Sequence, residues 1–222
     1  MPIALAKPVA HNGKDVGQNS HKGGSVMSYS VMFYAVDVPK LQAIYGSKNE
    51  ALLKEVIDAR SADLDDNDAF FEDYGLPVDS RSAIRQIFEG TVPQDDLSVA
   101  AMYGYVLKIL CEHLGEFAGG DIYSTRILPF DSKLMANGPP IPIPDDPGDF
   151  PEIGYLTKEG ILAEKEAAAN ALPPSSPNFY DNMREFTHHA LDEDELLEEL
   201  EAYQDVLAEL AETGLGTVAF RH

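Results

Sequence analysis

The chain has 222 residues, of which 44% are hydrophobic, and this is enough to build a sizeable core. Acidic residues outnumber basic ones by 38 to 16, and the net charge of −22 argues against direct nucleic-acid binding because phosphates would be repelled. No stretch approaches about 18 continuous apolar residues and one cysteine forms no intramolecular disulfide, so we expect a cytoplasmic protein with no membrane segment.

Residues 1–27 differ from the rest of the chain because they have no hydrophobic periodicity and a polar, glycine-rich second half. Lys7 and Pro8 interrupt the short apolar stretch, which is therefore shorter than the core of about 7–15 residues that a secretory signal requires. We interpret this segment as a disordered leader, or as an upstream extension of a gene whose working start is Met27. Both interpretations leave residues 28–222 as a single domain.

The first elements of that domain are indicated by composition and turn residues. β-branched and aromatic residues predict a strand over 29–36, and its apolar character on both faces favours burial on two sides. Pro39 suits the first turn of a short helix that stops at Gly46. The spacing of Ser47 and Glu50 predicts a capping box that opens the next helix.

The middle of the chain alternates between helical and extended patterns. Ser80 and Ser98 are the expected caps of two further helices, the second of which carries apolar residues at helical spacing as far as Leu114. The helical pattern is lost from Gly115 to Pro151, where six prolines between 139 and 151 forbid a helix and favour an extended loop. Thr157 is expected to start another helix, followed by a short one over 179–189.

The strongest periodic pattern lies near the C-terminus. An apolar stripe predicts an amphipathic helix that stops at Gly214 and is formed by Leu196, Leu200, Tyr203, Leu207 and Leu210. Residues 216–220 then predict a last strand, which pairs most economically with the first. The predicted fold class is therefore α+β: a small sheet that includes the N- and C-terminal strands, packed by several helices, with more helix than strand.

Motifs that carry chemistry are absent from the sequence. It has no phosphate-binding loop, dinucleotide fingerprint, zinc-protease helix, nucleophile elbow or C-x-x-C pair, so we predict no cofactor and no metal site. Residues 63–68 resemble the start of a calcium loop, but Asp68 and Tyr74 stand where that loop needs glycine and glutamate. A solvated acidic turn is the favoured interpretation.

One histidine is the focus of the alternative interpretation, an enzyme or small-ligand-binding domain. His113 follows Cys111 on the predicted helix, and its apolar neighbours favour a core or boundary histidine beside a buried structural thiol. A pocket near His113 would be lined by Tyr103, Asp121 and Arg126, the weak catalytic candidates, under the proline-rich loop. We favour a protein without catalytic activity.

The distribution of charge gives the clearest functional indication. Residues 185–220 hold 11 acids and no lysine or arginine, and ten of these acids fall within 192–212, which spans only about 30 Å as a helix. The acids are then closer together than the screening length of about 8 Å, so their fields add. The candidate partner-binding residues are Asp192, Glu193, Glu195, Glu198 and Glu199.

Two interpretations of this acidic helix remain open. It either keeps the protein soluble or steers a basic protein partner into place. The most concrete form of the second is an immunity or inhibitor protein that neutralises a basic toxin or nuclease. Self-association through the leucine stripe is a third interpretation, and the oligomeric state stays open.

Several segments carry a family resemblance. The chain reads S-Y-x-x-x-F-Y-A-V-D from Ser28, C-E-H-L-G-E from Cys111 and F-P-x-I-G-Y-L-T from Phe150, and it closes with the G-x-x-x-F of 216–220. In these segments it resembles an uncharacterised family of bacterial proteins, a domain of unknown function, over about residues 28–222. The resemblance implies a soluble bacterial protein and supplies no catalytic residues.

Overall fold

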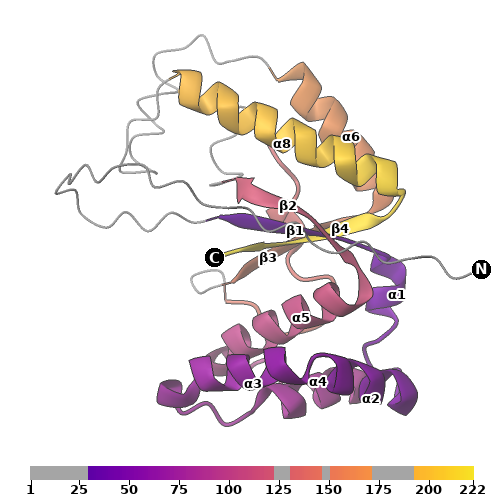
Figure 1. Cartoon of the computed structure of the whole chain (residues 1–222), viewed down its shortest axis with the longest axis vertical. Helices are drawn as coiled ribbons and strands as arrows, with labels where there is room; N and C mark the ends of the chain where they lie inside the picture. The colour runs from indigo at the N-terminus through magenta and orange to yellow at the C-terminus, as the bar shows by residue number, and fades with distance from the viewer. Residues whose placement is uncertain (1–29, 123–130, 147–150, 172–192) are drawn as a thin grey trace, which may run out of the picture.

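The structure is a computed structural model that describes residues 30–122, 131–146, 151–171 and 193–222 (Figure 1). The predicted leader over 1–27, the predicted short helix over 179–189 and Arg126 lie outside the described residues.

A four-stranded antiparallel sheet forms the centre of the molecule. Its strands are β1 (Val31–Val36), β2 (Glu116–Ile122), β3 (Glu152–Leu156) and β4 (Gly216–Arg221), in the order β2-β1-β4-β3. β1 and β4 pair along their whole length, from Val31 opposite Arg221 to Val36 opposite Gly216. This confirms the predicted pairing of the first and last strands.

Five helices lie on one side of the sheet, some against it and others in an outer layer (Figure 1). They are α1 (Val38–Gln42), α2 (Glu50–Ala59), α3 (Ser61–Phe70), α4 (Ser80–Glu89) and α5 (Ala100–Leu114). α5 lies against the sheet, where Leu107 and Leu110 share a buried cluster with Tyr34 and Phe220. Three short 3₁₀ turns complete the described helices, at Glu72–Tyr74, Leu97–Val99 and Met135–Asn137.

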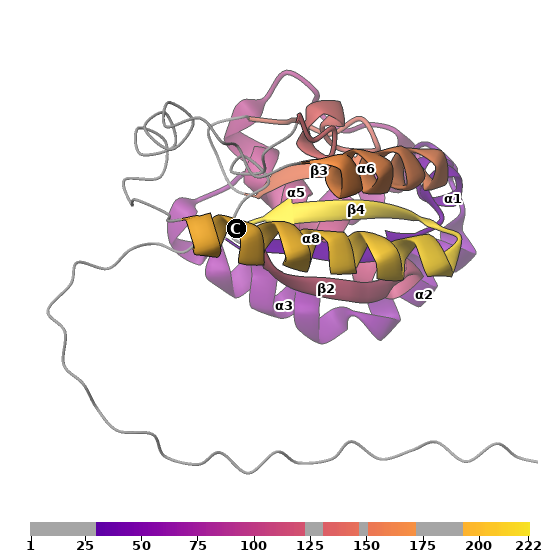
Figure 2. The ribbon, with the colours of Figure 1, turned by 90° about the horizontal axis from the view of Figure 1, so that it is seen from above.

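The opposite face is covered by α6 (Lys158–Asn170) and α8 (Glu193–Thr213), which lie side by side in both views (Figures 1 and 2). Phe33 of β1 packs there in a second buried cluster with Tyr203 and Leu207 of α8. Successive residues of a strand point to opposite faces, and both faces of β1 are buried. Its odd-numbered and its even-numbered residues therefore both need to be apolar. The fold is α+β and helix-dominated, as the pattern predicts, and helices pack on both sides of the sheet.

The segment Leu97–Leu114 is long and apolar enough to cross a membrane by composition, with a mean hydropathy of 1.2. However, 56% of it is buried inside the fold. α5 is thus a helix of the core, with more than half of this segment buried.

The prediction of an acidic turn over 63–68 is wrong, because these residues form most of α3. Leu64 and Asn67 lie three residues apart and are buried, which gives the helix an inward face. On its outward side, Asp65 forms an ion pair with Arg81 of α4, with 2.7 Å between Oδ1 and Nη1. The inward face is too narrow to produce an obvious hydrophobic period.

Three predicted caps are displaced and two strands were not predicted. Ser98 lies inside the 3₁₀ turn Leu97–Val99, and α5 begins after Val99 without a side-chain cap. Asn49, not Ser47, caps α2 by accepting from the backbone N–H of Leu52, and Asp79 rather than Ser80 caps α4. β2 and β3 lie in or beside the region interpreted as a loop. Pairing with β1 and β4 stabilises these short strands, and a local pattern does not report such distant contacts.

Candidate functional site

Five exposed carboxylates form a ridge along the outer side of α8. The acidic ridge consists of Glu198, Glu201, Asp205, Glu209 and Glu212. Spacings of three and four residues keep these side chains on one side of the helix, over about 21 Å. Leu200, Tyr203, Leu207 and Leu210 are buried on the other side.

The charges of the acidic ridge are not neutralised by neighbouring side chains. α8 carries no lysine or arginine, and no ion pair joins a ridge carboxylate to another residue in the part of the chain that the structure describes. Adjacent carboxylates on the ridge lie within the screening length of about 8 Å. Their potentials therefore add at the surface.

The structure distributes the predicted partner-binding residues unevenly. Glu198 is exposed on the acidic ridge, whereas Glu199 is half-buried and already has an interaction partner. Glu193 and Glu195 belong to α8, but their side chains lie outside the described residues, as does Asp192.

Sequence reasoning left four members of the ridge out of the candidate set, namely Glu201, Asp205, Glu209 and Glu212. The signal that finds them is the acidic stripe opposite the leucine stripe on the same helix. A linear cluster of acids, by contrast, mixes exposed and half-buried positions.

The structure describes the side chains of two of the four residues of the alternative pocket, His113 and Tyr103, and they lie apart on α5. The His113 side chain is 14% exposed and its Nε2 lies 3.6 Å from Glu55 of α2, which agrees with a boundary histidine. Tyr103 is fully buried and donates its hydroxyl hydrogen to Gln86, and burial raises the pKa of Tyr103 to about 12. These two residues are ten positions apart on α5, or about 15 Å along its axis.

The other two residues cannot be placed in that pocket. Asp121 lies in β2, but its side chain, like all of Arg126, is outside the described residues. Two cavities among the described residues, one between α3 and α5 and one beside Pro151, are not lined by His113.

Cys111 is a structural thiol, as predicted. It is fully buried, and burial raises the pKa of the thiol well above its ordinary value. A buried, protonated thiol is a poor nucleophile. Within the described ranges, no three histidine, cysteine or carboxylate side chains are placed to hold a metal ion together.

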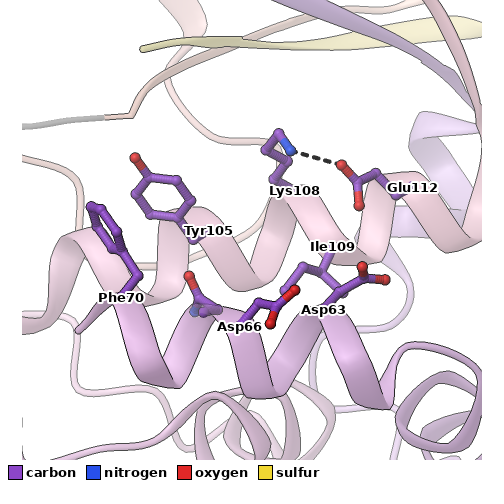
Figure 3. A pocket seen from close by; sticks show the side chains of 8 residues that line it. Asp63, Asp66, Phe70, Tyr105, Lys108, Ile109 and Glu112 are labelled. Carbon is purple, nitrogen blue, oxygen red and sulfur yellow. Dashed lines mark hydrogen bonds and ion pairs between the residues drawn. The ribbon is translucent and has the colours of Figure 1, made fainter. Parts of the chain in front are cut away.

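A groove of about 300 Å³ lies between α3 and α5 (Figure 3). Each helix contributes four residues to this α3–α5 groove at the same spacing of i, i+3, i+4 and i+7. They are Asp63, Asp66, Asn67 and Phe70 from α3, and Tyr105, Lys108, Ile109 and Glu112 from α5. The helices run in opposite directions, so Phe70 meets Tyr105 at one end and Asp63 lies near Glu112 at the other (Figure 3).

Most charged groups of the α3–α5 groove are already paired. Lys108 Nζ lies 2.7 Å from Glu112 Oε1, which also accepts the Tyr34 hydroxyl at 2.8 Å. Burial together with this hydrogen bond raises the pKa of Tyr34. At the same end, Arg60 pairs with Asp63 at 3.3 Å and donates to the backbone carbonyl of Glu112.

Comparisons with known proteins give a family but no function. No curated protein and no solved structure matches the chain. A model of the family described as "Domain of unknown function (DUF7691)" matches residues 27–222. The match covers most of the sequence and includes every strand and helix described above, and the chain therefore belongs to this family of unknown function.

Proposed function

We propose that the protein binds a basic protein partner through the acidic ridge of α8. The observation that carries the proposal is the row of five exposed carboxylates without a described ion-pair partner. Such a row attracts a cationic surface over distances longer than a hydrogen bond and orients the approach.

The position of the acids supports binding over simple solubility. Glu209 and Glu212 lie in the last two turns of α8, where carboxylates oppose the helix dipole and the last turn carries no basic residue. Solubility is served equally well by acids elsewhere on the surface. Carboxylates at the C-terminal end of a helix reduce its stability, and we expect them there when a function needs negative charge at that position.

The specific form that we propose is an immunity or inhibitor protein of a bacterial cytoplasm, which neutralises a basic toxin or nuclease. A carboxylate row can occupy the site at which a nuclease holds phosphates, since both present closely spaced negative charges to arginine and lysine. The proposal requires no cofactor and no catalysis by this chain.

A pair of charge-matched variants tests the ridge. Glu201→Gln, Asp205→Asn and Glu209→Gln together remove three ridge charges, whereas Glu72→Gln, Asp73→Asn and Glu89→Gln remove three exposed charges on the helices beyond the other face of the sheet. The tagged full-length protein and both variants are used to capture partners from host lysate at low and high salt, with quantification by mass spectrometry.

We expect one basic protein to be captured at low salt by the native chain and by the second variant, and about ten-fold less of it by the ridge variant. Capture of this protein in equal amounts by the two variants would contradict the proposal, because it would show that the position of the removed charges has no effect on binding. The captured protein is then assayed for inhibition of its own toxic or nuclease activity.

An enzymatic function centred on His113 gains no support from the geometry. Tyr103 is fully buried in the core, and His113 does not line either of the two cavities described above.

A further inference from the structure

The α3–α5 groove has a composition that neither the acidic ridge nor the boundary histidine explains. Its lining holds the carboxylates of Asp63, Asp66 and Glu112 against the single ammonium group of Lys108. The formal charge of the lining is therefore three negative charges and one positive, or −2. A ligand that enters the groove must be neutral or cationic.

Asp66 is the carboxylate of the groove that is left for a ligand. Asp63 is paired with Arg60, and Glu112 with Lys108 and the Tyr34 hydroxyl. Asp66 is exposed and has neither an ion pair nor a hydrogen bond to another residue of the described chain. It lines the groove between the two paired ends (Figure 3).

The aromatic end of the groove supplies the second part of a cation site. The Phe70 and Tyr105 rings lie 5.8 Å apart, and the Phe70 side chain is 57% exposed although phenylalanine is usually buried. Tyr74, which is 66% exposed, stacks on the Phe70 ring with 6.1 Å between the ring centroids and an interplanar angle of 25°. An exposed aromatic face attracts an organic cation through its quadrupole.

Size and chemistry narrow the class of ligand. About 300 Å³ is at the lower limit for small-molecule sites, so the groove suits a single side chain or a small amine rather than a nucleotide. A bare divalent ion would need three converging ligands, and the described carboxylates and histidines do not provide such a group. A cation with an apolar stem can pair with the Asp66 carboxylate and also pack against the Phe70 and Tyr105 rings.

We propose that the α3–α5 groove binds an organic cation on an apolar stem, such as the guanidinium group of an arginine side chain. Asp66 is the counter-ion, and Phe70 and Tyr105 contact the stem and the face of the cation. This site lies on the opposite side of the sheet from the acidic ridge (Figure 1). The two proposals therefore succeed or fail separately.

A shape-matched pair of probes that differ in charge tests the site by NMR titration of the full-length protein. Nα-acetyl-arginine amide and Nα-acetyl-citrulline amide have nearly the same shape, but only the first carries a charge. We expect the arginine probe to shift the resonances of residues in the groove and to bind at least about five-fold more tightly than the citrulline probe. Equal affinity for the two probes, or binding of neither, would overturn the proposal.

Variants locate the binding within the groove. Asp66→Asn removes the counter-ion and Phe70→Leu removes the ring but keeps an apolar side chain, and each is expected to weaken arginine binding by about two- to five-fold. Asp73→Asn is the control, since Asp73 is an exposed acid outside the groove lining. Retained affinity in Asp66→Asn, with unchanged thermal unfolding, would also reject the site.

A third probe identifies the source of the cation. n-Butylguanidine carries the same guanidinium group, and the same single charge, on a free small-molecule stem. Tighter binding of butylguanidine would assign the groove to a free small molecule, whereas tighter binding of the blocked arginine would assign it to a side chain of a protein. Both results support a cation site.

Discussion

At the scale of single residues, the last side chain of the chain is held inside the structure. His222 Nδ1 lies 3.4 Å from the Tyr105 hydroxyl, and the imidazole ring packs 5.3 Å from the Tyr105 ring. Its Nε2 is buried and has no hydrogen-bond partner among the described residues. Burial, and to a smaller extent the nearby Lys108 ammonium, lower the pKa of His222 to about 4, whereas Glu112 opposes the shift.

This histidine predicts a pH-dependent contribution to stability. Its pKa is about 4 in the folded state and 6.5 for a histidine fully exposed to water, so the unfolded chain binds more protons between these values. The free energy of unfolding should therefore decrease as the pH falls from 6.5 towards 4, by up to about 2 kcal/mol at pH 5 from this group alone. Urea unfolding at pH 7 and pH 5 measures the loss.

His222→Gln is the matched variant, because its side chain does not titrate. The decrease between pH 7 and pH 5 should be smaller in this variant by the contribution of the histidine. An identical pH dependence in the two proteins would show that the imidazole is not buried in solution.

At the scale of elements, α6 and α8 are joined by a buried carboxylate. Glu164 of α6 is 3% exposed and accepts the Tyr203 hydroxyl of α8 at 3.0 Å. It also accepts the Ser132 hydroxyl and the backbone N–H of Lys133 at 3.1 Å. Buried charge is tolerated only when its lone pairs are satisfied in this way, and the network fixes how α8 lies on the sheet.

Removing that carboxylate should destabilise the α6–α8 layer. Glu164→Ala leaves three donors without an acceptor, and we expect a loss of about 3 kcal/mol in the free energy of unfolding. Tyr203→Phe removes one donor from an acceptor that keeps two others, so its loss should be near 1 kcal/mol. Chemical denaturation compares them, and a smaller loss for Glu164→Ala than for Tyr203→Phe would contradict the network.

The same layer shows which elements a sequence can predict. α8 is predictable because Leu200, Tyr203 and Leu207 repeat at helical spacing, and β1 because its apolar residues serve two cores. α3 escapes prediction because its buried positions are few and one is Asn67, which is satisfied by Ser80 at 2.8 Å. A polar residue that is hydrogen-bonded inside the core does not contribute to the hydrophobic pattern from which buried positions are predicted.

At the scale of the whole molecule, the two candidate sites occupy opposite sides of the central sheet. The acidic ridge lies on α8, which covers one face, and the α3–α5 groove lies among the helices that cover the other (Figures 1 and 2). Only the ridge is indicated by the sequence, because the acids of one helix are close in the chain. The groove joins residues about 40 positions apart, from Asp66 to Tyr105, and folding alone brings them together.

Site-specific photo-crosslinking in host cells tests the partner-binding ridge most directly. A photoreactive residue is placed at Glu201, on the acidic ridge, or at Asp73, beyond the opposite face of the sheet. We predict that the chain with the probe at 201 forms one adduct with a basic protein, that high salt reduces this adduct in lysate, and that the probe at 73 does not form it. The same adducts from both positions, or none from position 201, would contradict the account.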